Sequence, residues 1–406
     1  MIKYDVAIIG SGPAGIIAAI FASKRGKSVI LLEKNDNLGR KILATGNGRC
    51  NITNKNICIS RYHGSNSDFI SKVLNSFTEK QIIDFFESLG IFFKEEDNGR
   101  LFPRTNQASS VVDALHLELK ENNITVKLGS LVKRVDKDNG WTLKLDNDSI
   151  ILADKLILAT GGKAAPQFGS SGDGLFWATK FGHKIIPTYP ALVPIETNET
   201  WVKDIQGIKL EGTIKLIANG KDIVQKSGDI LFTHFGVSGP AVMGISREIS
   251  PCLKENIPAE IIIDPIPEET LKLLDQKIEN IFVLNGAKNV KNTLSGIIPL
   301  NLIPLILKNA GIVSDKKAAQ ISKKERNLIV ENIKNIKLTV KRLRPLKEAQ
   351  VTAGGVDTNE IDPLTMGSKI VPNLYFAGEI MDVDGDSGGF NLQWAWSSGY
   401  IAGNNI

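Results

Sequence analysis

The first 33 residues contain the pattern that most restricts how this chain can fold. An apolar run at residues 2–9 leads into the glycine turn Gly10–Gly15, and a helical period continues to residue 25. A second apolar run follows at residues 28–32. The period thus changes from that of a buried strand to that of a helix and back, which predicts a βαβ unit from Ile2 to Glu33.

The glycine turn has the spacing G-x-G-x-x-G, which in this context is typical of dinucleotide binding. The first glycine allows a tight turn, the second lets the backbone approach a pyrophosphate, and the third permits close packing of helix on strand. The free N–H groups and the dipole of the helix favour an anion at its N-terminus. Glu33 follows the second strand, where it is placed to accept hydrogen bonds from ribose hydroxyls. We expect cofactor contacts from Gly10, Ser11, Gly12, Pro13, Ala14, Gly15, Glu33 and Lys34.

Length and composition indicate a globular α/β protein with more than one domain. The chain has 406 residues, of which 42% are hydrophobic and 23% charged. A chain of this length rarely folds around a single hydrophobic core, so we expect two or three domains. No apolar run approaches the roughly 20 residues that span a bilayer, and Asp5 interrupts the N-terminal apolar run. We therefore expect a cytoplasmic protein without a membrane partner.

The cysteines restrict the chemistry. Cys50, Cys58 and Cys252 are the three cysteines, and none forms a C-x-x-C pair. A disulfide framework, a metal cluster and a dithiol redox centre are therefore not expected.

Periodicity and turn signals outline the elements that follow. We expect helices at Glu79–Leu89 and Ser109–Glu121 and, later, a helix that begins at Pro267 and another that begins at Ser322. Strands are expected between them, at residues 126–128, 131–136, 141–145, 149–152 and 155–160.

The sequence pattern changes after residue 190. Segments with alternating apolar and polar residues, separated by prolines, and an Asn219-Gly220 turn signal indicate antiparallel strands. We predict a Rossmann-like nucleotide-binding domain that is interrupted by an insert. Its two parts are residues 1–190 and 353–406, the β part of the insert is residues 191–266 and 337–352, and the helical part is residues 267–336.

Two further glycine turns favour FAD over a single NAD half-site. Leu158–Gly162 and Leu374–Glu379 both place glycines directly after an apolar strand, and the second is followed by the glycine-rich segment Asp382–Gly389. A helix is expected at Asn391–Ala402. The positive end of its dipole, aimed at a flavin, would stabilise the negative charge that develops on reduction.

Several long motifs identify a resemblance. The chain contains GSGPAG at residue 10, GRKILATGNGRCN at residue 39, LFTHFGVSGP at residue 231 and GGFNLQWAWSSG at residue 388. In these it resembles the YhiN/BaiN-type flavoproteins, which are NAD(P)/FAD-dependent or aminoacetone-oxidase-like oxidoreductases. The resemblance covers nearly the whole chain and implies bound FAD and a β-barrel-like insert that itself holds a helical piece.

These motifs, the two further glycine turns with the segment that follows the second, and the strand at residues 131–136 contain the other expected cofactor contacts. Arg40, Lys41 and Arg49 lie among glycines, where they are either ligands of the phosphates or the flavin, or solvated loop residues. Asn47 and Asn51 offer amide groups to the ring. The full set comprises Arg40, Lys41, Thr45, Gly46, Asn47, Gly48, Arg49, Cys50, Asn51, Val132, Thr160, Gly161, Gly162, Gly378, Glu379, Asp384, Gly389, Phe390, Asn391 and Leu392.

Candidate catalytic residues are fewer. Cys50 is a candidate redox residue, although a small packed residue near the flavin is the favoured interpretation. His234 is a candidate acid or base because an imidazole titrates near neutral pH, although a lone histidine is more often structural. Arg342 and Arg344 either bind an anionic substrate or line a cleft between domains.

The reaction expected is hydride transfer between a small organic substrate and flavin N5, with NAD(P)H as a transient electron donor. An oxidase that uses oxygen is an alternative, since the chain has no second complete G-x-G-x-x-G motif. A flavin-dependent RNA-modifying protein is another, because residues 316–347 hold eleven Lys and Arg residues against two Glu residues. A solvated helix face explains that run more simply, so a nucleic-acid partner is not expected.

Overall fold

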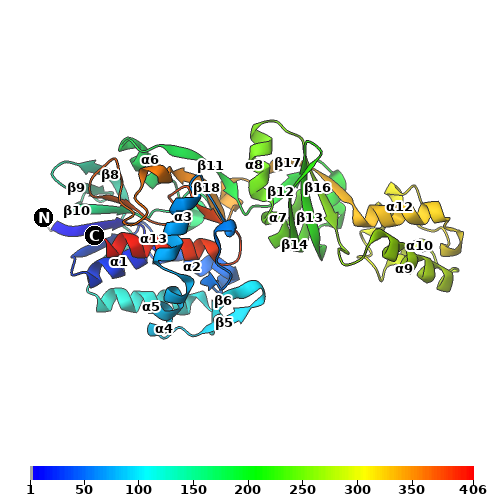
Figure 1. Cartoon of the computed structure of the whole chain (residues 1–406), viewed down its shortest axis with the longest axis horizontal. Coiled ribbons are helices and arrows are strands. Elements are labelled where there is room, and N and C mark those ends of the chain that lie inside the picture. The colour runs from blue at the N-terminus through cyan, green and yellow to red at the C-terminus, as the bar shows by residue number, and fades with distance from the viewer. Residues whose placement is uncertain (1–2) are drawn as a thin grey trace. The chain divides into compact units, whose positions relative to one another are not determined.

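The computed structural model describes residues 3–406, and the chain forms two compact units (Figure 1). Unit 1 comprises Met1–Pro190 and Leu346–Ile406, and unit 2 comprises Ala191–Pro345. Ile2, with which the predicted βαβ unit begins, lies outside the described residues. Residues 346–352, which the sequence pattern places in the β part of the insert, lie in unit 1. Among residues 3–406, no helix is both long enough and apolar enough to cross a membrane.

A seven-stranded sheet forms the centre of unit 1, in the order β7-β2-β1-β10-β9-β8, with β19 also paired to β10. The pairs β7–β2, β2–β1, β1–β10 and β10–β19 are parallel, whereas β9 and β8 are antiparallel additions. The strands are β1 (Lys3–Ile9), β2 (Val29–Leu32), β7 (Thr125–Lys127), β8 (Val132–Lys137), β9 (Trp141–Leu145), β10 (Ile150–Leu158) and β19 (Leu374–Phe376).

The two strands predicted at residues 149–152 and 155–160 are a single strand, β10. The Ala153-Asp154 pair resembles a turn in sequence because Asp is a poor strand former. In the structure the strand continues through it, since Ala153 pairs with β1 and β9 at once and Asp154 forms an ion pair with Lys3 at 2.5 Å.

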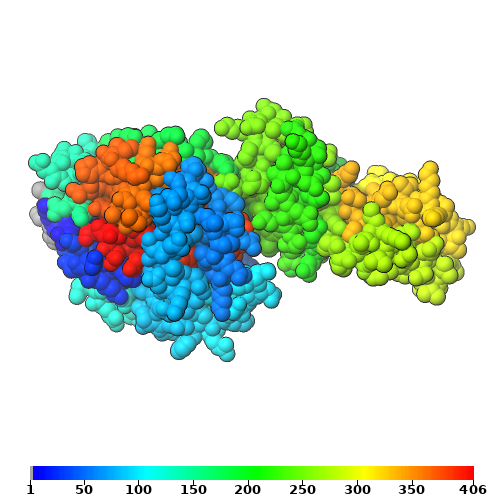
Figure 2. All heavy atoms as spheres, in the orientation of Figure 1, coloured from blue at the N-terminus to red at the C-terminus, as the bar shows by residue number. Residues whose placement is uncertain are grey.

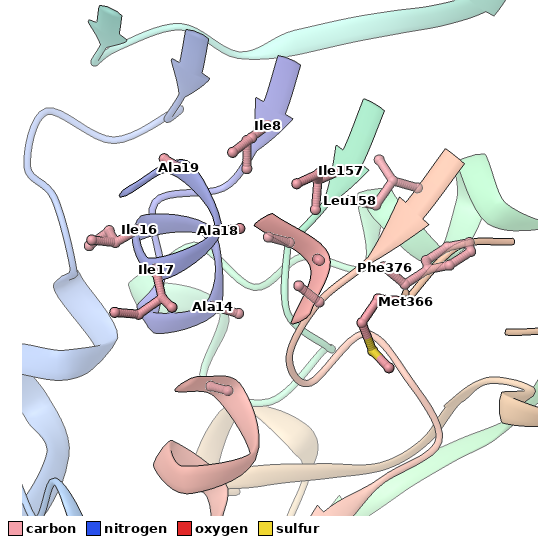
Figure 3. Close-up of a cluster of buried hydrophobic side chains, with 14 of the residues drawn as sticks. Ile8, Ala14, Ile16, Ile17, Ala18, Ala19, Ile157, Leu158, Met366 and Phe376 are labelled. Carbon is pink, nitrogen blue, oxygen red and sulfur yellow. The ribbon is translucent and has the colours of Figure 1, made fainter. Parts of the chain in front are cut away.

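Helix α1 (Pro13–Lys24) packs directly on the C-terminal helix α13 (Phe390–Asn404). The contact needs glycine, because a Cβ added at Gly399 would lie 2.4 Å from the carbonyl oxygen of Ala14, and one at Gly403 would lie 2.3 Å from that of Ala18. Figure 3 shows Ala14 and Ala18 on one side of α1 and Ile16 and Ile17 on another. Figure 2 shows the N-terminal residues in blue beside the C-terminal residues in red.

Shorter elements surround this framework. The other helices of unit 1 are α2 (Arg40–Ala44), α3 (Ser67–Ser76), α4 (Glu79–Ser88), α5 (Ala108–Glu121) and α6 (Asp173–Lys180). The small sheets pair β3 (Thr53–Asn54) and β5 (Phe93–Glu96) with β6 (Arg100–Pro103), β4 (Tyr62–His63) with β20 (Asp384–Gly385), and β11 (Ile185–Ala191) with β18 (Val351–Val356).

Unit 2 contains a closed antiparallel barrel in the order β12-β15-β14-β13-β16-β17 (Figure 1). Apolar residues alternate along its strands, as Leu210, Ile214 and Leu216 do in β13, and their side chains fill the interior. The strands are β12 (Ile195–Thr197), β13 (Lys209–Ala218), β14 (Lys221–Thr233), β15 (Gly236–Ser238), β16 (Ala259–Asp264) and β17 (Ile336–Leu343), with helices α7 (Pro240–Met243) and α8 (Ser246–Lys254).

A helical part lies between β16 and β17 and shares one hydrophobic core with the barrel. It contains α9 (Leu271–Leu284), α10 (Val290–Leu294), α11 (Ile303–Asn309) and α12 (Lys323–Lys334). Ser322 caps α12 through a capping box with Glu325, as predicted. The predicted start at Pro267 is wrong, because α9 begins after Thr270, whose side chain accepts a hydrogen bond from Leu273 N–H. The predicted fold class, a Rossmann-like domain with a barrel-like and helical insert, is confirmed.

The α1–α13 contact predicts the effect of adding a methyl group. Gly403→Ala should lower the free energy of unfolding of unit 1 by about 1–3 kcal/mol, because the methyl group meets a backbone oxygen that cannot rotate away. Chemical denaturation followed by tryptophan fluorescence measures this. Gly296→Ala is the matched control, since its Cβ would meet nothing within 4 Å. A Gly403→Ala protein as stable as the wild type would contradict the prediction.

Candidate functional site

Three glycine turns meet at the carboxyl ends of three neighbouring strands of the sheet. The backbone N–H of Ala159, after β10, donates to the carbonyl of Ile9, and that of Ala377, after β19, donates to the carbonyl of Leu158. Gly10 N–H in turn donates to Leu32. In open α/β sheets this edge is where nucleotides bind.

The first turn fits a phosphate. A Cβ at Gly10 would lie 2.5 Å from the carbonyl oxygen of Ala159, and one at Gly15 would lie 1.9 Å from that of Gly10, so both glycines are required by packing. Gly12 is different, since a Cβ there would meet nothing within 4 Å. Gly12 also precedes α1 without any side-chain cap, so the first N–H groups of the helix have no capping side chain and suit an anion.

Glu33 connects this turn to the end of β2. Its Oε2 accepts hydrogen bonds from Ser11 N–H at 2.9 Å and Ser11 Oγ at 2.7 Å, and its Oε1 accepts from the backbone and side chain of Asn35. Ser130 N–H donates to the Glu33 carbonyl, which brings the segment before Val132 beside the same turn. Lys34 instead extends to Ser171 and Asp173, at 2.5 and 3.1 Å.

The loop after α2 has an unusual backbone. Gly46, Asn47, Gly48 and Cys50 all adopt positive φ angles, between 57° and 81°. For Asn47 and Cys50 this conformation carries a steric cost, which persists when the surroundings require it. Such strain is common at ligand sites, and here it folds the loop back toward the start of α13.

Two basic residues of this region have acidic partners. Lys41 Nζ lies 2.6 Å from Glu379 Oε2, and both side chains are about one-fifth exposed. Arg49 lies 2.9 Å from Glu96 Oε1 and stacks over the ring of Phe102 at 4.2 Å. The Arg49 guanidinium therefore has a structural partner on each side. Arg40 is exposed and donates to the side chain of Asn35 at 2.8 Å.

Cys50 is fully buried, and burial raises the pKa of its thiol to about 12. A thiol with that pKa stays protonated at neutral pH, whereas the thiolate is the reactive form. The geometry thus favours packing over redox chemistry for Cys50.

The second and third turns are joined by a residue that sequence reasoning missed. Thr352 Oγ1 accepts hydrogen bonds from the N–H groups of Lys163 and Ala164, both at 2.8 Å, and Thr352 N–H donates to Glu379 Oε1 at 2.8 Å. A Cβ at Gly162 would lie 2.4 Å from Thr352 Oγ1. Thr352 belongs to no recognised sequence motif, so the sequence could have identified it as a site residue only from its position in β18. Thr160 and Gly161 belong to the same turn, with Gly161 at φ 71°.

The N-terminus of α13 closes the site. Gly389 precedes the helix with φ 102°, and no side chain caps it. Asn391 clamps the preceding loop, since its side chain both accepts from Gly385 N–H and donates to the Gly385 carbonyl, each at 2.8 Å. Tyr62 Oη donates to the carbonyl of Phe390 at 3.1 Å. Of the remaining predicted contacts, Leu392 lies in the first turn of α13, and Asp384, 2% exposed, lies in β20 before it. Gly378, which follows β19, lies beside a later turn of α13, where its N–H donates to Ser398 Oγ at 2.9 Å.

The comparisons with known proteins agree with this geometry. Residues 4–405 match the model of the HI0933-like protein Rossmann domain. A 3-dehydro-bile acid delta(4,6)-reductase of Clostridium scindens is 34% identical and covers 98% of both chains. A ribosomal RNA dihydrouridine synthase of Escherichia coli is also 34% identical over 100% of this chain and 98% of its own, and one of Haemophilus influenzae is 34% identical over 98% and 97%.

The chain belongs to the HI0933-like family. It is a FAD-dependent oxidoreductase, and its resemblance to the YhiN/BaiN-type flavoproteins is confirmed. Among solved structures, a 3-ketosteroid delta1-dehydrogenase from Sterolibacterium denitrificans has a TM-score of 0.53 at 13% identity and covers 99% of both chains, which shows a shared fold alone.

The residues of this HI0933-like protein fit FAD on two observations. Gly12 faces open space beside the uncapped start of α1, which suits a pyrophosphate. Asn51 Oδ1 is buried near the start of α13 without a hydrogen-bond partner, which suits the polar edge of a flavin.

His234 belongs to unit 2, at the exposed turn between β14 and β15, with its ring 5.0 Å from that of Phe235. The guanidinium of Arg344 stacks on the same Phe235 ring, 4.5 Å from its centroid. Arg342 and Arg344 both bind Glu196, at 2.7 and 3.3 Å. Hydrogen bonds from Arg342 and Lys341 lower the pKa of the Glu196 carboxyl to about 2. Both arginines therefore have an acidic partner inside unit 2.

Removing the Glu33 carboxylate should weaken FAD binding. Glu33→Ala should raise the dissociation constant about 10- to 100-fold, because hydrogen bonds to a charged group contribute about 1.5–3 kcal/mol. Titration of apo-protein with FAD, followed by flavin fluorescence, measures the change. Asp154→Ala is the control, because that carboxylate pairs with Lys3 on the surface. An unchanged dissociation constant for Glu33→Ala would show that Glu33 does not contact the cofactor.

Proposed function

We propose that this protein reduces a carbon–carbon double bond that is conjugated with a carbonyl group, with NAD(P)H as the electron donor and a small organic molecule as the substrate. The observation that carries the proposal is what the relatives share. A delta(4,6)-reductase of a 3-dehydro bile acid and a dihydrouridine synthase both reduce such a bond, in a steroid ring and in a uracil ring. Relatives of both kinds are 34% identical to this chain over nearly its whole length.

The reaction balances without a further reactant. NAD(P)H contributes a hydride, solvent contributes a proton, and the double bond gains both, leaving NAD(P)⁺ and a saturated product. FAD, when bound, supplies the hydride-carrying position N5 between the two substrates. The remaining work falls to the protein, which binds, orients and screens the reacting groups.

The site supports this division of roles. Its thiol, Cys50, is protonated and buried, and the described residues contain no cluster of three or more metal-binding side chains. The partly buried Lys41–Glu379 pair and the uncapped start of α13 provide fixed charges and dipoles instead. Preorganised groups of this kind stabilise negative charge on a reduced cofactor and on the enolate formed beside the carbonyl group.

Anaerobic stopped-flow spectroscopy tests the proposal in two steps. NADH or NADPH should bleach the flavin absorption band, and 4-androstene-3,17-dione, a conjugated ketone, should restore it without oxygen. The saturated analogue of that ketone is the control and should leave the flavin reduced. If neither nucleotide bleaches the band, the reductase assignment is wrong. If only oxygen restores it, and neither this ketone nor uridine-containing RNA does, the protein is an oxidase.

A uridine in RNA is the second candidate substrate for the same reaction. Two relatives named ribosomal RNA dihydrouridine synthase support it, and so does the distribution of charge. Unit 2 holds 22 Lys and Arg residues against 17 Asp and Glu residues, whereas unit 1 holds 27 of each. The basic stretch is weaker than its sequence suggests, because Lys316, Arg326 and Lys334 form ion pairs with Glu325, Asp275 and Asp264.

RNA as substrate makes a separate prediction. Ribosomal RNA from cells that lack this protein should lose dihydrouridine at a defined position, and the purified protein with NAD(P)H should restore it. Binding to that RNA should weaken steeply as salt rises, because phosphate contacts release counterions. Unchanged dihydrouridine content in the deletion strain would exclude this candidate.

A further inference from the structure

Asn51 has a side chain that the fold itself does not use. It is 8% exposed, and its Oδ1 is one of five buried side-chain oxygen atoms that lack a hydrogen-bond partner among the described residues. A buried polar atom without a partner costs about 1–3 kcal/mol, so nearly all such atoms have one in the working state of a protein. The unused amide therefore indicates a partner from outside the chain.

Neighbouring buried amides show the contrast. Asn54 donates to the carbonyls of Asn98 and Gly388, at 3.1 and 2.8 Å, and its Oδ1 accepts from Asn56 N–H. Gln393 is bound through both ends of its amide, to Thr53 and to the carbonyl of Phe77. These side chains connect one segment of the fold to another, whereas that of Asn51 does not.

Glycine residues let the backbone come close to Asn51 and its side-chain amide. Two glycine turns approach it, and a Cβ at Gly46 would lie 3.0 Å from Asn51 N, while one at Gly389 would lie 3.1 Å from Asn51 Oδ1. Gly389 also precedes α13 without a side-chain cap, so free backbone N–H groups begin directly beside the unused amide. The Asn51 Oδ1 acceptor and the backbone N–H donors at the start of α13 therefore lie close together.

We propose that the Asn51 amide recognises the imide edge of the flavin ring. That edge presents a carbonyl, the N3–H group and a second carbonyl in a row. Asn51 Oδ1 accepts from N3–H while Nδ2 donates to an adjacent carbonyl, a paired arrangement like that of amide side chains on nucleobase edges. The uncapped start of α13 then faces the same end of the ring and favours the negative charge of the reduced form.

This inference rests on FAD binding and not on the substrate or the electron donor. Its test is therefore independent of the double-bond reductase proposal and requires no catalytic turnover. The probe is 3-methyl-FAD, in which a methyl group replaces the N3 hydrogen. Because the cofactor is altered and the protein is not, the first measurement needs no variant that has to fold.

Apo-protein should bind 3-methyl-FAD about tenfold or more weakly than FAD, since the methyl group removes one hydrogen bond and crowds Asn51 Oδ1. Asn51→Ala should bind FAD less tightly and should bind the two cofactors within about twofold of each other, because the group that discriminates is gone. Asn54→Ala is the matched control. It should lower stability but keep the full preference for FAD.

The midpoint potential of the bound flavin is the second readout. Asn51→Asp should make it more negative than in the wild type, because a carboxylate beside the ring opposes the charge of the reduced flavin. A wild-type protein that binds both cofactors equally would overturn the proposal. So would an Asn51→Ala protein that retains the wild-type preference for FAD.

Discussion

The close contact between the first and the last helix is the constraint on which the rest of the structure depends. Gly399 and Gly403 let α13 approach the backbone of α1 at Ala14 and Ala18 so closely that no side chain fits between them. Glycine in a helix interior costs about 1 kcal/mol relative to alanine, and here it permits the contact. This contact matters for the proposed cofactor site, because α1 begins at the glycine turn that suits a phosphate and α13 begins where we propose that the flavin ring lies. Their packing fixes the distance between two helix N-termini.

A site arises between them because three parallel strands end at the same edge of the sheet. The turns after β1, β10 and β19 are linked by backbone hydrogen bonds, and Thr352 ties the second turn to Glu379 in the third. Both helix starts lack side-chain caps, so both offer N–H groups to a ligand. The positive ends of two dipoles suit a cofactor with a pyrophosphate at one end and a ring that gains negative charge at the other.

Local patterns in the sequence predict much of this, and long-range contacts account for what they miss. The βαβ unit, the glycine roles and the Ser322 cap are encoded within a few residues, so their periods and spacings are legible. The ion-pair partners of Lys41 and Arg49 cannot be predicted from local patterns, because Glu379 lies 338 residues from Lys41 and Glu96 lies 47 residues from Arg49. Thr352 and Tyr62 bear no motif, and their importance follows only from what the fold brings beside them. The strand break expected at Ala153-Asp154 failed for the same reason, since pairing on both sides overrides a weak local preference.

Hydrogen–deuterium exchange of the protein with and without FAD tests the central claim most directly. If the two helix starts form one cofactor site, FAD should slow the exchange of backbone amides in three separate segments together, at residues 10–16, 46–52 and 389–393. Protection should appear at the same FAD concentration in all three, because one binding event orders them. Protection confined to residues 10–16, with residues 389–393 unchanged at saturating FAD, would contradict the account.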